Sequence, residues 1–94
     1  MDKKLKARWI KALRSGRYEQ TTGVMESFGS YCCLGVLRKI MHPTSKKTAP
    51  SEDILCPSHA IEAGLHVRSQ RKLTELNDEG KTFPEIAAFI EKHY

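Results

Sequence analysis

The stretch 33–41 is apolar on nearly every side, and this constrains the fold more than any other feature of the chain. Its apolar residues recur at helical spacing, and only Arg38 and Lys39 within it are polar. His42-Pro43 ends the helix, because proline disfavours helical backbone in the residue before it. Such a helix has to be covered on several sides, so we expect it at the centre of the protein. A chain of 94 residues buries enough surface for one modest core.

Other amphipathic segments supply helices to cover this central one. The clearest signal is at the C-terminal end, where Thr82 and Glu85 form a capping box ahead of an apolar stripe. We predict helices over 3–14, 33–41, 58–63, 69–76 and 82–94, and a tight turn over 77–80. Their apolar faces predict one core cluster of Trp9, Leu13, Cys33, Val36, Leu37, Ile40, Leu73, Leu76, Phe83, Ile86 and Ile90.

The segment 17–31 has a different character. Gly16, Gly23 and Gly29 make a long helix unfavourable there, and the composition favours a short β-hairpin. Residues 42–58 are rich in Ser, Thr, Lys and Pro, which predicts a flexible loop. We therefore expect one mostly α (α+β) domain over 1–94. It would have four or five short helices around one core and a small β-hairpin between the first two.

Composition argues against a membrane protein and against a secreted disulfide scaffold. No apolar run approaches the ~20 residues that cross a bilayer, and Met1-Asp2-Lys3-Lys4 does not begin a signal peptide. The three cysteines include the adjacent pair Cys32 and Cys33, which would bridge only with strain. We expect free thiols in a reducing cytoplasm.

The cysteines could also bind zinc or act as nucleophiles, but the sequence argues against both roles. Cys56 and His59 have ligand spacing for zinc, but a structural zinc site needs two such pairs. A nucleophilic cysteine needs a lowered thiol pKa, whereas the apolar neighbours of Cys32 and Cys33 indicate burial, which raises it. We therefore expect no metal, no cofactor and no enzymatic activity.

Positive charge is concentrated at the N-terminal end of the chain. Residues 1–17 hold seven Lys and Arg against one Asp, a net charge of +6, whereas residues 18–94 hold nine against ten acidic residues, a net −1. A local basic surface of this kind attracts an acidic protein, a phosphate or a nucleic acid. Solvation of the outer helix face is the simpler alternative.

Polar residues at two places could form a binding site for an anion. Arginine supplies a forked donor and tyrosine a stacking face, and the free amides of the last helix lie beside the second group. The two groups would form a polar pocket if the hairpin and the 77–82 turn meet. The predicted ligand- or partner-binding residues are Arg14, Arg17, Tyr18 and Gln20 in the first group, and Asn77, Asp78 and Thr82 in the second.

Three segments resemble a family of small uncharacterised proteins common in bacteriophage and prophage genomes. The family patterns are W-x-x-A-L-R-S-G-x-Y-x-Q, matched over 9–20, Y-C-C-L-G-V-L, matched over 31–37, and L-N-D-x-G-x-S-F-x-E-I-A, matched over 76–87. This chain has Thr82 where the pattern favours serine, which keeps the capping chemistry. It has Arg38 where relatives often have a further cysteine, which argues against a metal site there.

The resemblance implies a phage setting, and phages use many small proteins to block host enzymes, transcription or defences. We therefore expect a non-enzymatic accessory protein in the host cytoplasm that binds and blocks or sequesters a host component. An anti-CRISPR-like inhibitor of an acidic host protein and a sponge for an anionic signalling nucleotide both fit this description. The alternative is a small basic nucleic-acid-binding protein that uses its first helix. A homo-oligomer is compatible with either function.

Overall fold

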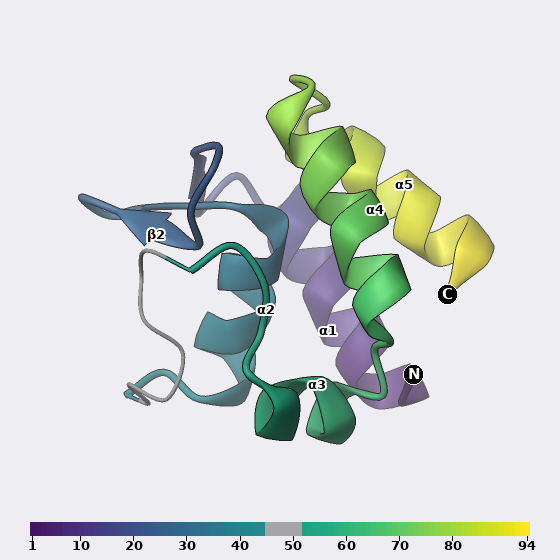
Figure 1. The fold of residues 1–94 in the computed structure, drawn as a ribbon. Coiled ribbons are helices and arrows are strands. Elements are labelled where there is room, and N and C mark those ends of the chain that lie inside the picture. Colours follow the sequence, from purple (N-terminus) through teal and green to yellow (C-terminus); the bar gives the residue numbers. More distant parts are fainter. Residues whose placement is uncertain (45–51) are drawn as a thin grey trace.

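Five helices surround the core and a small sheet lies beside them in the computed structural model, which describes residues 1–44 and 52–94 (Figure 1). The elements in chain order are α1 (Lys3–Arg14), β1 (Glu19–Gln20), β2 (Glu26–Ser27), β3 (Ser30–Tyr31), α2 (Cys33–Met41), α3 (Pro57–Ala63), α4 (Val67–Asp78) and α5 (Phe83–His93). This confirms the predicted fold class. None of the helices in the described part of the chain is long and apolar enough to cross a membrane.

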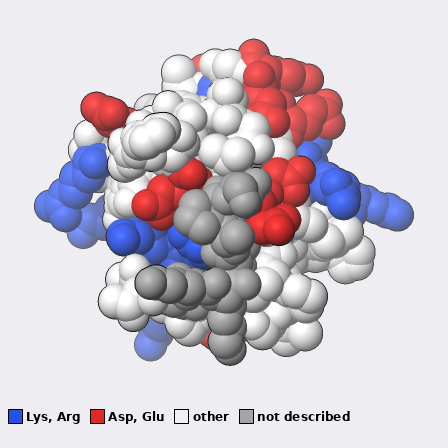
Figure 2. All heavy atoms as spheres, turned by 60° about the vertical axis from the view of Figure 1, so that its left-hand side comes forward, with Lys and Arg blue, Asp and Glu red and all other residues white. Residues whose placement is uncertain are grey.

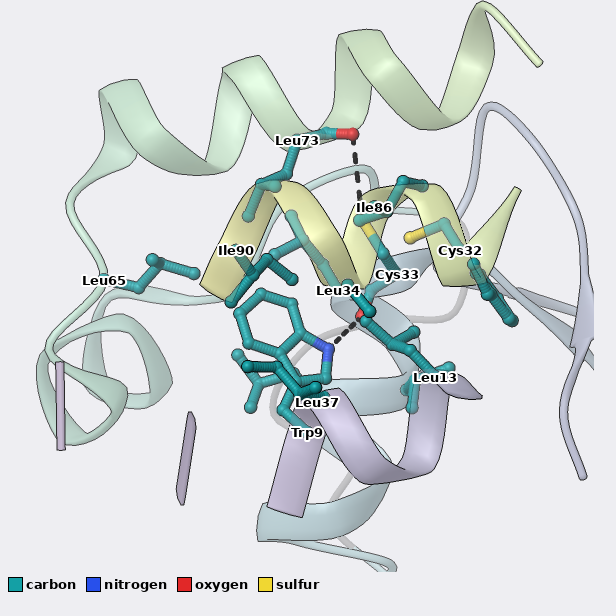
Figure 3. Packing of buried hydrophobic residues seen from close by; sticks show 14 of the residues in the cluster. Trp9, Leu13, Cys32, Cys33, Leu34, Leu37, Leu65, Leu73, Ile86 and Ile90 are labelled. Atoms are coloured by element: carbon teal, nitrogen blue, oxygen red, sulfur yellow. Dashed lines mark hydrogen bonds between the residues drawn. The ribbon is translucent and has the colours of Figure 1, made fainter. Parts of the chain in front are cut away.

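Helix α2 lies at the centre of the core, as its composition predicts. Its residues from Cys33 to Arg38 are buried, and α1 and α4 pack against it. The indole Nε1 of Trp9 in α1 donates to the carbonyl of Cys33 at 2.9 Å, which joins the two helices through a buried hydrogen bond (Figure 3). Helix α5 closes the core with Ile86 and Ile90, both of which are buried.

The predicted core is confirmed for all but two of its members. Ile40 and Leu76 are only partly buried and pack on the outside of the cluster. The core also contains large apolar residues that the predicted cluster omitted, among them Met25, Leu34, Leu55 and Leu65. Leu34 lies in α2, whereas Met25, Leu55 and Leu65 lie in irregular segments, where helical periodicity gives no signal.

The expected hairpin is present as part of a three-stranded sheet. Strands β2 and β3 pair antiparallel, with Ser27 opposite Ser30, and the connecting turn consists of Phe28 and Gly29, both at positive φ (49° and 82°). Strand β1 adds to β3 in parallel, which gives the order β1-β3-β2. The parallel strand was not predicted.

Helix α4 is longer than predicted, and the prediction of a turn over 77–80 is wrong for its first half. The helix begins at Val67 and includes Asn77 and Asp78. Asn77 is fully buried, and its side chain hydrogen-bonds to other segments, so tertiary contacts override its local preference for a turn. Part of the predicted loop 42–58, residues 45–51, lies outside the described residues. The last two residues of the predicted loop, 57 and 58, belong to α3, which begins at Pro57.

Candidate functional site

The two groups of predicted binding residues meet, through the side chains of Gln20 and Asn77. The Oδ1 atom of Asn77 accepts from Gln20 Nε2 at 3.0 Å and from the backbone N–H of Cys33 at 3.2 Å. Its Nδ2 donates to the carbonyl of Thr21 at 2.7 Å, and Gln20 Nε2 also donates to the carbonyl of Lys81 at 2.7 Å. These two amides therefore hold the segments together, and both are engaged within the fold.

The 77–82 group is engaged in a similar way. Asp78 accepts from the backbone N–H of Gly23 at 2.9 Å. The Thr82 hydroxyl accepts from the N–H of Glu85, and the Glu85 carboxylate accepts from the N–H of Thr82 at 3.1 Å. This capping box lowers the pKa of Glu85, because the backbone N–H and then the hydroxyl of Thr82 donate to the carboxylate. The start of α5 thus already holds a negative charge, and Pro84 has no N–H to offer.

The adjacent cysteines are part of the core. Burial raises the pKa of Cys32, and it raises that of the fully buried Cys33 much further. The Cys33 thiol lies 3.7 Å from the carbonyl of Leu73 and donates to it, which requires the protonated form (Figure 3). A buried, protonated thiol is a poor nucleophile. Within residues 1–44 and 52–94, no three His, Cys, Asp or Glu side chains gather as a metal site would require.

A basic hollow lies between α1 and the end of α2. Its cationic residues are Arg8, Lys11 and Arg17, all exposed, and Tyr18 forms part of its wall. The cavity volume is about 470 Å³. Gly16, at a φ of 75°, turns the chain after α1. Arg17 and Tyr18 can therefore lie beside the helix that precedes them.

Two contacts position the walls of this basic hollow. Arg8 Nη2 donates to the carbonyl of Ile40 at 3.4 Å, which draws the arginine toward the end of α2. The ring of Tyr18 packs edge-to-face against Tyr31 of β3, with centroids 5.5 Å apart. The aromatic ring is thereby held by the sheet, while the guanidinium of Arg17 stays exposed to solvent.

Arg14 lies apart from the basic hollow, on the side of α1 that faces α5. Its guanidinium pairs with Glu91 at 3.3 Å, so the charges there partly cancel. A smaller hollow of about 250 Å³ brings Arg14 together with Tyr18, Gln20 and Thr82. The structure thus divides the predicted residues between two places. The predicted site omitted Arg8 and Lys11. Their spacing in the sequence could have identified them as one cationic surface, because residues three apart on a helix are neighbours.

The cations differ in how much of their placement the fold itself explains. Lys11 and Arg14 lie in the last turn of α1, where a positive charge interacts favourably with the free carbonyl groups of the helix end. Arg8 lies before that turn and Arg17 lies beyond the helix. The contact of Arg8 with the Ile40 carbonyl stabilises the end of α2, whereas neither helix end accounts for the position of Arg17.

Comparison with known proteins gives a family and no function. A family model described as "Domain of unknown function (DUF8296)" matches residues 1–53, which include α1, the sheet and α2. No curated protein and no solved structure matches the chain.

Proposed function

Since the chain belongs to this DUF8296 family, we propose its function from the geometry: it is a non-enzymatic binding protein that engages an acidic protein surface through its basic hollow. The observation that carries the proposal is the convergence of Arg8, Lys11 and Arg17 beside Tyr18. Three cations from two segments of the chain form a preorganised positive surface. Such a surface speeds the encounter with a negative partner and fixes its register.

The openness of the basic hollow favours a macromolecule over a free nucleotide. Arg8, Lys11 and Arg17 are all exposed, and the amides that could have enclosed a small ligand, Gln20 and Asn77, bond to each other. Small-molecule sites usually bury most of the ligand surface. Carboxylates presented on a protein surface suit this exposed arrangement better, because arginine pairs with them in a forked geometry.

The resemblance to bacteriophage proteins supports a proposal about where the protein acts and what kind of partner it binds. In that setting the acidic partner is a component of the bacterial host, and binding blocks or sequesters it in the host cytoplasm. The protein would then act by occupying a surface, with no reaction of its own. A host-defence enzyme with an acidic binding face is the kind of partner that fits.

Nucleic acid is the second candidate, and one observation favours it. The positive charge extends beyond the basic hollow, because Lys3, Lys4 and Lys6 precede it along α1. A row of cations longer than the hollow suits a phosphate backbone. In that case, binding would depend on all of α1 and would vary little with the residues in the hollow.

The test is capture of partners from a bacterial host lysate by the purified protein. We expect the double variant Arg8→Glu/Arg17→Glu to lose a partner that the wild type retains. The matched control is Lys92→Glu, a charge reversal at an exposed position on α5. Retention by the control and loss by the double variant supports the basic hollow. Loss by both in proportion to the charge reversed shows diffuse electrostatics, and loss by neither rules the hollow out.

A second readout identifies the chemistry of the partner. Proteins, nucleic acids and small molecules eluted from the wild type are each analysed by mass spectrometry. An acidic protein supports the proposal. A nucleotide retained by the wild type and absent from Arg8→Glu/Arg17→Glu would replace the protein partner with a small anion at the same site.

A further inference from the structure

Phe28 at the tip of the hairpin occupies a turn position whose backbone conformation disfavours phenylalanine. It is the first of two residues at positive φ, a geometry typical of a type I′ turn, for which Asn-Gly is the preferred sequence. A bulky residue at a φ of 49° is strained. The ring is also fully exposed, at 106% of its reference area. Neither the backbone nor the core gains from a phenylalanine here.

A residue that adopts an unfavourable local conformation and does not stabilise the fold tends to mark a functional position. Aromatic side chains, phenylalanine among them, are enriched in the buried core of protein interfaces. The hairpin itself is held firmly by its strand pairing, and Met25 just before β2 donates to the carbonyl of Glu52 at 2.9 Å. Phe28 is therefore a protruding apolar side chain on a well-positioned support.

The chain also carries an apolar hollow large enough to receive this ring. It lies between α3 and the start of α4, has a volume of about 530 Å³, and contains Leu55 and Leu65. Ile61 and Val67, the other exposed large apolar residues of the described chain, line the same hollow. A cavity of about 150 Å³ is enough to bind benzene. Since Phe28 is fully exposed, it does not occupy the hollow of its own chain.

The hairpin segment and the helix that follows the α3–α4 hollow carry charges of opposite sign. The segment 18–31 contains Glu19 and Glu26 and no Lys or Arg. The Glu26 carboxylate pairs with Arg38 of α2 at 3.1 Å, so Glu19 is the exposed carboxylate of this segment. Figure 2, which brings the side of the sheet forward, shows carboxylates in the middle of this face and along its upper edge, with Lys and Arg at both sides and next to the central carboxylates. In contrast, residues 64–73 contain Arg68, Arg71 and Lys72 and no acidic residue. Arg71 lies one helical turn after Val67, on the same side of α4.

The wall of the α3–α4 hollow is fixed to the rest of the protein. His42 at the end of α2 lies 2.9 Å from the carboxylate of Glu62, and its ring stacks on that of His59 in α3 at 4.6 Å. Leu55 N–H donates to the buried side chain of Gln70 in α4. The carboxylate of Glu62 is thereby turned toward the end of α2.

We propose that Phe28 of one copy inserts into the α3–α4 hollow of a second copy, so that the protein associates with itself. The contact joins two different surfaces, and it therefore closes only if two copies exchange hairpins, or else continues as a chain. The buried area is small, which predicts a dissociation constant on the order of 0.1–1 mM. This inference does not involve the basic hollow.

Sedimentation of the purified protein over a range of concentrations tests the proposal. We expect the weight-average mass of the wild type to rise above the monomer mass of 10.7 kDa as the concentration approaches the order of 1 mM. Phe28→Asn should remain monomeric, and Phe28→Tyr, which keeps an aromatic ring, should still associate. Ile61→Gln should also remain monomeric, because it removes apolar surface from the hollow at an exposed position.

Mixing two of these variants gives a direct control. The Phe28→Asn protein keeps the hollow and the Ile61→Gln protein keeps the ring, so a mixture regains one contact and stops at the dimer. Increasing the salt concentration should weaken this association, because the hairpin segment carries Glu19 and α4 carries Arg71, charges of opposite sign.

The melting temperature separates a binding role of Phe28 from a structural one. At concentrations where the protein is monomeric, Phe28→Asn should raise Tm by about 1–5 °C, because asparagine adopts positive φ more readily. A wild type that stays monomeric at about 1 mM overturns the proposal. So does a Phe28→Asn variant that associates as strongly as the wild type. A lower Tm for Phe28→Asn would show that the ring serves the fold.

Discussion

Cys33 contributes three hydrogen-bonding groups to the interior. Its carbonyl accepts from Trp9, its N–H donates to Asn77, and its thiol donates to the carbonyl of Leu73. One residue thus connects α2 to α1 and to α4. The side chain is small enough for the crowded centre and still polar enough to satisfy a carbonyl.

The raised thiol pKa values predict how stability depends on pH. The thiols of Cys32 and Cys33 are held protonated in the fold, while in the unfolded chain they ionise near their ordinary pKa of 9.0. The unfolded state therefore loses protons first as pH rises. Above about pH 9, we expect each thiol to lower the free energy of unfolding by up to about 1.4 kcal/mol per pH unit. Below about pH 8 this contribution is fully present.

Urea unfolding of the wild type and of Cys33→Ala at several pH values measures this effect. The alanine variant loses packing at every pH, but its decline in stability above about pH 9 should be shallower than that of the wild type. Tyrosine and lysine residues that titrate in the same range are common to both proteins and cancel in the comparison. Parallel pH profiles for the two proteins would contradict the burial of a protonated thiol at this position.

Asn77 shows where reasoning from single residues fails. Followed by Asp78, Glu79 and Gly80, it has the composition of a turn. Its actual partners are Gln20, Thr21 and Cys33, which lie 44 to 57 positions away in the chain. A local pattern carries no information about such contacts. The burial of the cysteines was predictable because their apolar neighbours are adjacent in sequence.

At the scale of elements, α2 and the segment before β2 are packed with no space between them. A Cβ atom added to Gly35 would overlap the backbone carbonyl of Met25. Alanine is favoured over glycine within a helix by about 1 kcal/mol. Overpacking costs about 1–3 kcal/mol or more, and here the obstacle is a backbone that cannot rotate away.

We therefore expect Gly35→Ala to lower the free energy of unfolding by about 1–3 kcal/mol, against the trend of helix propensity. Urea unfolding measures the change. Gly16→Ala is the control, because Gly16 has nothing within 4 Å of its Cβ position and a φ of 75°. Only backbone strain acts there, at a cost of about 1 kcal/mol. A Gly35→Ala protein more stable than the wild type would show that α2 does not touch Met25.

The elements that the sequence predicted best have local signals. The capping box of α5 and the apolar stripe of α1 lie within a few residues of the helix ends and faces that they specify. The parallel pairing of β1 with β3 has no such signal, because each strand is two residues long. It is held instead by a few backbone hydrogen bonds, such as that from Thr21 to Tyr31 at 2.9 Å.

For the molecule as a whole, the sequence predicted where the positive charge lies, but it predicted only in part which cations share one surface. Arg17 and Tyr18 were predicted as partners and share the basic hollow. Arg14 was assigned to the same surface, yet it pairs with Glu91 of α5, 77 positions away. Arg14 lies beside Lys11 on α1 but turns toward α5, because α1 packs against α5. That packing depends on long-range contacts that a charge count does not include.

Salt dependence distinguishes a basic hollow from a uniformly basic helix at this scale. For a 20-nucleotide single-stranded DNA as probe, each neutralised phosphate contributes about −0.7 to the slope of log K against log salt. If only Arg8, Lys11 and Arg17 make contact, we expect weak binding with a slope of about −2. If all seven cations of residues 1–17 make contact, the slope is about −5. Fluorescence anisotropy between about 50 and 200 mM salt measures it.

The hollow variant makes this measurement decisive. Under the proposed function, Arg8→Glu/Arg17→Glu removes most of the binding to the DNA probe, and Lys92→Glu changes it little. A slope near −5 that falls by only about two contacts in the double variant would show that the whole of α1 binds phosphates. The nucleic-acid function would then replace the acidic protein surface as the proposed role of this protein.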